Sequence, residues 1–269
     1  MTGRTVLVTG ATDGLGRALA HELVGSGATV LVHGRSADRI ASTVAELERA
    51  GGEGRVRSYE ADFASLAEVR EMAERVLAAE ERLDVLVNNA GIGTNVPGGG
   101  ERMVSADGHE LRFAVNYLAG YLLTEQLRDL LSRSAPARVV YVSSAGQAPL
   151  DFDDLMLTRH YNGVQAYCQS KLAQIMEAID LSELFEPGEL SANALHPATY
   201  MPTKIVPSPM STLQEGVEAT YRLIASPELD GRSGRYYNGG RPTRAHPQAY
   251  DRDARARLAA ISKELTEAV

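Results

Sequence analysis

The chain of 269 residues is long enough for one large α/β domain with a substantial core, and its 44% hydrophobic and 23% charged residues are ordinary for a globular protein. The formal net charge of −8 argues against a general nucleic-acid or anionic-membrane binder, although it leaves room for a local basic pocket. The apolar run that begins at Val6 and all later runs are too short for a signal peptide or a membrane span, so we expect a cytoplasmic protein without a membrane anchor.

Short β-rich runs alternate with helical patterns from one end of the chain to the other. This alternation predicts an α/β fold with a doubly wound parallel sheet of about seven strands and helices on both faces. The expected strands are residues 5–9, 29–33, 56–60, 85–88, 138–143, 191–195 and 234–237, with helices between them, including one over 107–132. No linker or repeat divides the chain, so we expect a single domain over residues 1–269.

A glycine-rich turn follows the first strand and opens the first helix. Its glycines stand where the backbone must turn tightly and approach a ligand closely. The amino terminus of the next helix offers unpaired N–H groups and a partial positive charge to a pyrophosphate. With a βαβ continuation, this turn predicts a dinucleotide-binding Rossmann fold. The expected cofactor contacts in the turn are Gly10, Thr12, Asp13, Gly14, Leu15 and Gly16.

The end of the second strand indicates which dinucleotide is bound. NAD enzymes commonly place a carboxylate there for the ribose diol, whereas an arginine can accommodate the extra phosphate of NADP. Here the strand ends at His33 and Arg35 follows, without a carboxylate. We expect Arg35 to bind that phosphate, with Arg17 or Arg39 assisting, so NADP(H) is favoured over NAD(H). The alternative is three solvated surface arginines.

Tyr167 and Lys171 are four residues apart and therefore share one face of a helix. A nearby ammonium favours phenolate and pulls the tyrosine pKa below its ordinary value of about 10, toward a range useful for proton transfer. The pair is a candidate general acid and base. The same spacing is common on solvated helix flanks, so its context must decide.

Four motifs, in order, resemble the short-chain dehydrogenase/reductase family over essentially the whole chain. They are the glycine turn, Asn88-Asn89-Ala90-Gly91, the Ser144 region and Tyr167-x-x-x-Lys171. The resemblance implies hydride transfer between a nicotinamide and a carbonyl or alcohol. Tyr167 would donate a proton to the carbonyl oxygen, Lys171 would lower the Tyr167 pKa and bind the nicotinamide ribose, and Ser144 would orient the oxygen.

Other roles follow from the same resemblance. Asn116 would hold a helix kink and a proton-relay water, and Ser143 is the alternative to Ser144. Asn116, Ser144, Tyr167 and Lys171 are thus the expected catalytic set. The further cofactor contacts that the family implies are Asp62, Phe63, Asn89, Ala90, Gly91, Tyr167, Lys171, Pro197 and Thr199.

The interval of 23 positions from Ser144 to Tyr167 is longer than in typical members and resembles the subgroup of retinol dehydrogenases and related carbonyl reductases. Loops at 145–163 and 196–215 would wall a largely apolar substrate pocket, which suggests a hydrophobic ketone, aldehyde or alcohol. The expected pocket residues are Gly146, Phe152, Tyr161, Tyr200 and Met201, with surface packing as the alternative for Tyr161. The acidic residues at 151, 153 and 154 are interpreted as a helix start or solvated loop, and no metal is expected.

We therefore expect an NADP(H)-dependent oxidoreductase acting on CH–OH groups, most simply a reductase of hydrophobic carbonyl compounds. Two alternatives would use the same fold: an NADPH-binding regulatory protein without redox turnover, and a tailoring epimerase or dehydratase. The resemblance also suggests a homodimer or homotetramer through the helices of Asn116 and Tyr167. From the acidic net charge we expect no nucleic-acid partner. The single cysteine, Cys168, is interpreted as helix packing.

Overall fold

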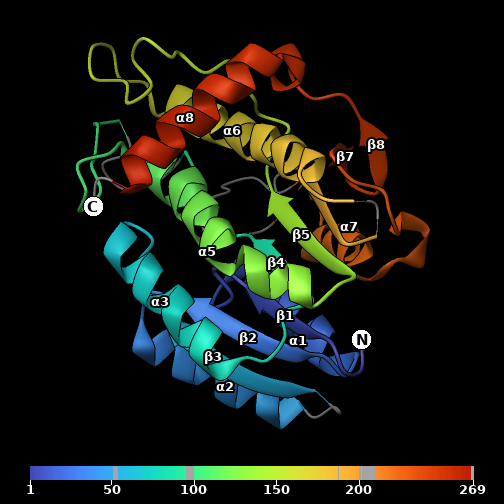
Figure 1. Cartoon of the computed structure of the whole chain (residues 1–269). Helices are drawn as coiled ribbons and strands as arrows, with labels where there is room; N and C mark the ends of the chain where they lie inside the picture. Colours follow the sequence, from blue (N-terminus) through green and yellow to red (C-terminus); the bar gives the residue numbers. More distant parts are fainter. Residues whose placement is uncertain (51–53, 95–99, 187, 200, 202–209, 268–269) are drawn as a thin grey trace.

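The computed structural model describes residues 1–50, 54–94, 100–186, 188–199, 201 and 210–267. Its strands are β1 (Thr5–Val8), β2 (Thr29–Gly34), β3 (Arg55–Glu60), β4 (Val85–Asn88), β5 (Ala137–Val142), β6 (Leu190–His196), β7 (Arg235–Asn238) and β8 (Arg241–Thr243). They form one sheet in the order β3-β2-β1-β4-β5-β6-β7-β8, with helices packed against it on both sides (Figure 1). The prediction of a doubly wound, single-domain α/β fold is confirmed.

The seven predicted strands agree with the observed ones to within one residue at each end, and all seven pair in parallel. The eighth strand, β8, was not predicted, and it pairs antiparallel with β7. It has three exposed residues and contains Pro242. Such a short edge strand has no alternating apolar pattern by which a sequence would reveal it.

Helices fill the connections between the strands. The longer ones are α1 (Gly14–Gly25), α2 (Ala37–Ala50), α3 (Leu66–Ala79), α5 (Ala119–Arg133), α6 (Gly163–Glu183), α7 (Leu213–Ala225) and α8 (Arg252–Glu267). The shorter ones are α4 (Leu111–Phe113), the π-helical η1 (Ala114–Leu118) and the 3₁₀ turns η2 (Pro227–Leu229) and η3 (Pro247–Tyr250).

The helix predicted over 107–132 begins later, at α4, because Glu110 caps it by accepting the Phe113 N–H. It then continues through η1 into α5. Upstream of the cap, Gly108 has a φ of +81°, and the Ser105 N–H donates to the carbonyl of His109. The residues just before Glu110 therefore form a tight turn and are not part of the helix.

Two apolar cores lie on opposite faces of the sheet. Val6 and Val8 of β1 belong to the core under α1, α2 and α7, whereas Leu7 belongs to the core under α3, α5 and α6. This alternation is the period of a β-strand, and burial on both faces explains why the central strands read as continuous apolar runs.

The order of the strands reverses between β1 and β4, which places a crevice at their carboxyl ends. The Thr9 hydroxyl fixes this point. It donates to the carbonyl of Val87 and accepts the N–H groups of Asn89 and Ala90, each at 2.9 Å. The glycine turn after β1 and the Asn88–Gly91 motif after β4 therefore lie side by side.

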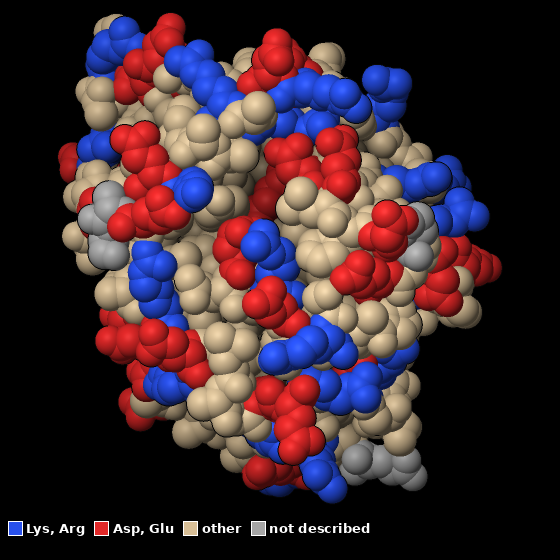
Figure 2. All heavy atoms as spheres, in the orientation of Figure 1, with Lys and Arg blue, Asp and Glu red and all other residues tan. Residues whose placement is uncertain are grey.

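The carboxyl-terminal helix α8 packs against α6 and crosses it in the view of Figure 1. On the face of the molecule in Figure 2, acidic and basic side chains are interspersed. Within the described ranges, no helix is both long enough and apolar enough to cross a membrane.

Candidate active site

The glycine turn after β1 is shaped for close approach of a ligand. Gly10 has a φ of +64°, and a Cβ on it would lie 2.9 Å from the Cα of Ala90. A Cβ on Gly16 would lie 2.3 Å from the carbonyl oxygen of Gly10. Side chains at either position would force the backbone apart. The turn leads into the amino terminus of α1, so its form and its polarity fit a pyrophosphate.

Side chains around the turn hold its conformation. Asp13 caps α1 by accepting the Gly14 N–H. The Arg39 guanidinium bonds the Thr12 carbonyl at 3.0 Å and pairs with Asp13 at 2.9 Å. Thr12 and Asp13 are thus part of the turn as predicted. Arg39 stabilises the turn by binding these two residues.

The expectation that Arg17 assists with the cofactor phosphate is not met, because its guanidinium pairs with Glu46 on α2. Arg35, in contrast, is exposed directly after β2. No carboxylate in the described part of the chain pairs with Arg35. Of the three arginines considered, Arg35 alone therefore presents a guanidinium not engaged by these protein groups.

His33 links the cofactor-side loops, a role that the sequence did not reveal. Its Nδ1 accepts the Gly10 N–H at 3.1 Å, and its Nε2 lies 3.1 Å from the Ala61 carbonyl, which requires the proton on Nε2. Burial lowers the pKa of His33 to about 4, so the ring is neutral. Phe63 stacks on it with ring centroids 4.1 Å apart. The sequence signal that could have revealed this role is a polar residue, His33, at the end of a buried strand that faces the glycine turn.

The predicted residues after β3 and β4 differ in what they contact. Asp62 accepts the Ala64 N–H in the loop that carries Phe63. The Asn89 side chain donates to the carbonyl of Thr9 at 2.7 Å. Gly91 lies beside the reaction centre, since a Cβ on it would be 3.2 Å from Asn116 Oδ1 and 3.5 Å from Lys171 Nζ.

Ser144, at the end of β5, and Tyr167, on α6, are brought together. The Ser144 hydroxyl lies near the Tyr167 ring, since a Cβ on Gly146 would be within 4 Å of both side chains, and it accepts the Gly146 N–H at 3.0 Å. The hydroxyl of Ser143 instead donates to the carbonyl of Lys171 at 2.7 Å. Side chains alternate along the chain at a strand end, so one of two adjacent serines faces α6's backbone and the other faces Tyr167.

The structure corrects the expected effect of Lys171 on Tyr167. The Lys171 ammonium donates to the Val142 carbonyl at 2.8 Å and to Gln174 Oε1 at 3.1 Å, and it lies 5.8 Å from the centroid of the Tyr167 ring. Burial raises the pKa of Tyr167, and the nearby Ser144 hydroxyl opposes this rise. Burial also lowers the pKa of Lys171 to about 7. Desolvation therefore outweighs the expected attraction between ammonium and phenolate.

Asn116 lies in η1, which is the helix irregularity expected at this position. Its Oδ1 accepts the Ile92 N–H at 2.6 Å, and its Nδ2 donates to the Ile92 carbonyl and to the Ser170 hydroxyl. The side chain thus ties the loop after β4 to the helix that carries Tyr167 and Lys171. The proton-relay water stays a prediction.

The predicted substrate-pocket residues are dispersed. Gly146 is in the reaction centre, because a Cβ on it would lie 3.5 Å from Ser144 Oγ and 3.9 Å from Tyr167 Cε1. Phe152 packs instead under the Arg257 guanidinium of α8. Met201 also departs from the prediction, since its sulfur packs on Gly216 of α7, in the core on the other side of the sheet. Tyr200 lies outside the described residues.

The loops predicted at 145–163 and 196–215 each lead to a residue that caps the following helix. The first ends at Asn162, whose side chain caps α6, and the second ends at Thr212, which caps α7. Within the first loop, the Asp154 carboxylate accepts the N–H and hydroxyl of Thr158 and the N–H of Arg159, which holds the pKa of Asp154 well below its usual range. The acidic residues therefore close a turn, as interpreted from the sequence.

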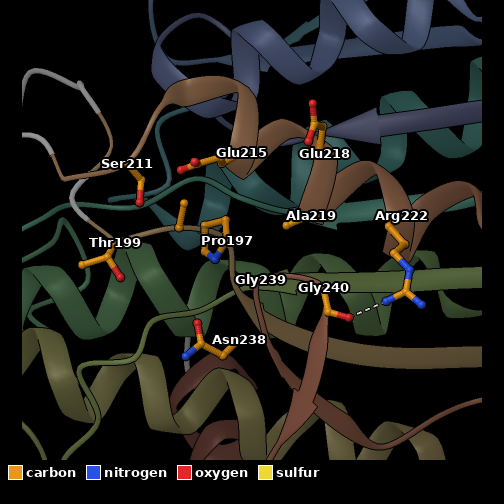
Figure 3. A pocket seen from close by; sticks show the side chains of 11 residues that line it. Pro197, Thr199, Ser211, Glu215, Glu218, Ala219, Arg222, Asn238, Gly239 and Gly240 are labelled. Carbon is orange, nitrogen blue, oxygen red and sulfur yellow. Dashed lines mark hydrogen bonds between the residues drawn. The ribbon is translucent and has the colours of Figure 1, made fainter.

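A cavity of about 440 Å³ opens between α7 and the ends of β6 and β7 (Figure 3). Pro197 and Thr199, two predicted cofactor contacts, line it together with Glu215, Arg222 and Asn238. Arg222 donates to the Gly240 carbonyl across its floor. Of the residues with described positions, its lining includes neither Ser144 nor Tyr167, so this cavity does not contain the reaction centre.

A doubly wound sheet with a glycine turn at its switch point defines the class of dinucleotide-binding α/β proteins. The comparisons place the chain within that class. The sequence profile described as short chain dehydrogenase matches residues 4–211. The chain belongs to this family, whose members are oxidoreductases that bind a nicotinamide cofactor.

Individual relatives cover most of the chain. Retinol dehydrogenase 14 of Homo sapiens is 36% identical over 98% of this chain and 86% of its own length. DnrU of Streptomyces sp. (strain C5), named as a daunorubicin C-13 ketoreductase, is 35% identical over 90% of this chain and 85% of its own. A Beutenbergia cavernae structure, described as an NAD(P) dependent gluconate 5-dehydrogenase with bound NADP at low occupancy, superposes with a TM-score of 0.71 at 28% identity, covering 88% of this chain and 95% of that one. The predicted resemblance to retinol dehydrogenases is confirmed.

Proposed function

We propose that this chain is an NADP(H)-dependent carbonyl reductase that acts on a hydrophobic ketone or aldehyde. The observation that carries the proposal is the cluster at the carboxyl end of β5. There the Ser144 hydroxyl lies beside the Tyr167 phenol and lowers its pKa, and the Lys171 ammonium lies 5.8 Å from the same ring. A proton donor, a hydroxyl beside it and a buried cation together suit the reduction of a carbonyl group.

In this proposal Tyr167 is the general acid. Burial raises its pKa above the ordinary value, so the phenol is protonated at neutral pH and can give its proton to the carbonyl oxygen. The Ser144 hydroxyl orients that oxygen and, by bonding the phenolate that remains, opposes the rise in pKa. Alcohol oxidation would require the phenol to lose its proton first. The resting protonation state therefore suits reduction.

The residues around the crevice fit a nicotinamide dinucleotide, which when bound supplies the hydride for the substrate carbon. The glycine turn would hold its pyrophosphate, Asp62 and Phe63 would lie at the adenine, and Arg35 would bind the extra phosphate of NADP. Asn89, Ala90 and Gly91 would run along the cofactor, Lys171 would bind the ribose, and Pro197 and Thr199 would meet the carboxamide. The bound NADP of the Beutenbergia structure supports the choice of cofactor.

The substrate class rests on the relatives' names and on the loops beside the site. Retinol is an apolar alcohol, and the daunorubicin C-13 ketoreductase is named for a ketone. The loops at 145–163 and 196–215 would form the pocket walls within the single domain of residues 1–269, and Leu150 and Leu155 of the first loop are buried apolar residues.

We predicted a homodimer or homotetramer through the helices of Asn116 and Tyr167. The surface of these helices that would form the interface is already covered by α8 of the same chain. The Tyr117 hydroxyl, next to Asn116, is 2.8 Å from Ser262 of α8, and Arg255 of α8 pairs with Asp180 and Glu183 of α6. We therefore propose that α8 closes this surface within one chain and that any homo-oligomer uses another.

A turnover screen with both nicotinamide cofactors tests the proposed activity. The purified chain is mixed with NADPH or NADH and a panel of apolar ketones and aldehydes, and with NADP or NAD and the matching alcohols. We expect carbonyl-dependent consumption of NADPH, faster than that of NADH. Tight NADPH binding without turnover of any panel member would instead favour the regulatory alternative.

A further inference from the structure

A buried polar cluster lies beside the reaction centre, and the proposed proton transfer does not use it. Glu110 and Arg112 are both fully buried, with Arg112 Nη1 3.9 Å from Glu110 Oε1. Tyr161 completes the cluster, because its hydroxyl donates to Glu110 Oε1 at 3.1 Å and accepts from Arg112 Nη1. Burying two charges is costly unless their hydrogen bonds are satisfied, so the cluster has a strongly preferred geometry.

The cluster joins three segments that are distant in the sequence. Arg112 Nε donates to the carbonyl of Gly93 at 3.0 Å, and its Nη2 donates to that of Thr94 at 3.4 Å. Glu110 Oε2 accepts the Phe113 N–H at 2.7 Å, at the start of α4. Tyr161 belongs to the loop before α6. The loop after β4, the start of α4 and the loop before α6 therefore meet at one guanidinium.

The cluster lies where it can hold the backbone segments that border the reaction centre. Asn116, one helical turn after Arg112, holds the N–H and carbonyl of Ile92, while Arg112 holds the next two carbonyls. The backbone that follows Gly91, next to Lys171, is thus fixed from one side. The loop that Tyr161 anchors begins near Gly146, beside Ser144 and Tyr167. Neither Arg112 nor Tyr161 needs to touch reacting atoms to affect the pocket.

We propose that Glu110, Arg112 and Tyr161 form a positioning cluster that holds the loop before α6, residues 145–162, against the loop after β4 as a wall of the substrate pocket. Loss of the cluster would let this wall move while the residues on β5 and α6 keep their places. The cluster therefore controls substrate affinity rather than proton transfer. The inference rests on the proposed carbonyl reductase function.

Tyr161→Phe tests the proposal, because it removes the shared hydroxyl and keeps the ring. We expect the KM for a carbonyl substrate to rise about tenfold, as for the loss of a hydrogen bond to charged groups, with kcat and NADPH affinity changed less than about twofold. Tyr121→Phe is the matched control, since the Tyr121 hydroxyl has no hydrogen-bond partner among the described residues. Its KM should match that of the unmodified chain.

Glu110→Gln is a second variant that tests the proposal. The amide keeps the shape of the side chain and an acceptor oxygen, but it removes the carboxylate that faces Arg112. Its KM should also rise, and the effect of the double variant should fall short of the product of the single effects, since both act on one cluster. Independent effects in the double variant would contradict a shared cluster. So would a fall in kcat at constant KM.

Hydrogen exchange separates this inference from the proposed function, because it needs no turnover. In Tyr161→Phe, amides of residues 92–94 and 146–161 should exchange faster than in the unmodified chain, while those of β5 and α6 should not change. If no carbonyl compound is reduced but this pattern appears, the cluster stands and the activity assignment fails. Unchanged exchange together with an unchanged KM would overturn the positioning role.

Discussion

The amino group of Lys171 is buried in the site, and its hydrogen-bond partners there are neutral oxygen atoms. Its two hydrogen-bond acceptors are the Val142 carbonyl and the Gln174 side chain. Burial is the cause of its lowered pKa, and no neighbouring carboxylate offsets it. A buried lysine in such surroundings is destabilising, which is characteristic of residues retained for function.

This destabilisation should depend on pH. The pKa of Lys171 is lowered from 10.5 to about 7, so between these values the unfolded chain binds a proton that the folded protein does not. Its contribution to the free energy of unfolding is most unfavourable below pH 7 and improves as the pH rises toward 10.5. We expect Lys171→Met to stabilise the protein by about 2–4 kcal/mol at pH 7 and by much less at pH 10. Urea unfolding at both pH values checks this, with exposed Lys263→Met as the control. An effect independent of pH would contradict the argument.

Cofactor preference is also decided by single residues. Arg35→Ala should weaken NADPH binding about tenfold or more and leave NADH binding nearly unchanged, because only NADPH carries the extra phosphate. Arg39→Ala should weaken both cofactors, since Arg39 holds Thr12 and Asp13 of the glycine turn. Fluorescence titration measures the four affinities. Equal losses of NADPH and NADH in Arg35→Ala would rule out the phosphate role.

The sequence identifies the residues of the site better than the directions of their side chains. Helical spacing was enough to single out Tyr167 and Lys171, and family resemblance named Ser144, but two adjacent serines cannot be told apart until the strand end is placed against α6. The pKa of Tyr167 was predicted in the wrong direction, because spacing along a helix does not report how deeply a residue is buried. Met201 was misplaced for a similar reason. Its packing on Gly216 depends on which side of the sheet the chain takes after β6.

At the scale of elements, the turn between β1 and α1 depends on the absence of side chains. Gly16→Ala would place a Cβ 2.3 Å from the Gly10 carbonyl oxygen. We expect it to lower the free energy of unfolding by about 2 kcal/mol and to weaken NADPH binding, as overpacking moves the turn. Gly25→Ala, at the end of the same helix, meets nothing within 4 Å and should be neutral or slightly stabilising. Urea unfolding and NADPH titration compare the two variants, and similar results for both would contradict the close approach.

Elements with strong patterns were predictable, and elements defined by tertiary contacts were not. The buried strands carry apolar runs bounded by turn residues, so their ends were predicted to within one residue. The π segment at Asn116 has no such pattern, because its i to i+5 hydrogen bonds differ from those of an α-helix without any change in residue type. It was expected from family resemblance rather than from propensity.

At the scale of the whole molecule, α8 joins parts of the site that are distant in sequence. Arg255, with 5% of its surface exposed, pairs with Asp180 and Glu183 of α6. Tyr117 of η1 meets Ser262 of the same helix. The last helix thus supports both the segment that carries Asn116 and the helix that carries Tyr167.

Arg255→Met should therefore lower the free energy of unfolding by about 2–3 kcal/mol, because it leaves the half-buried Asp180 carboxylate without its partner. Arg257→Met is the matched control on the same helix. Arg257 is exposed and pairs with exposed Asp153, so its loss should cost about 0.5 kcal/mol or less. Urea unfolding distinguishes the two. Equal costs would mean that α8 is held by its apolar face rather than by the ion pairs of Arg255.

The central claim is that Tyr167 is the proton donor in a carbonyl reduction. Single-turnover reduction by Tyr167→Phe, with NADPH bound to saturation and a carbonyl substrate from the screen, tests it most directly. We predict a rate at least about a hundredfold below that of the unmodified chain, with NADPH affinity nearly unchanged, while Tyr121→Phe reacts at the normal rate. A normal single-turnover rate in Tyr167→Phe would contradict the account.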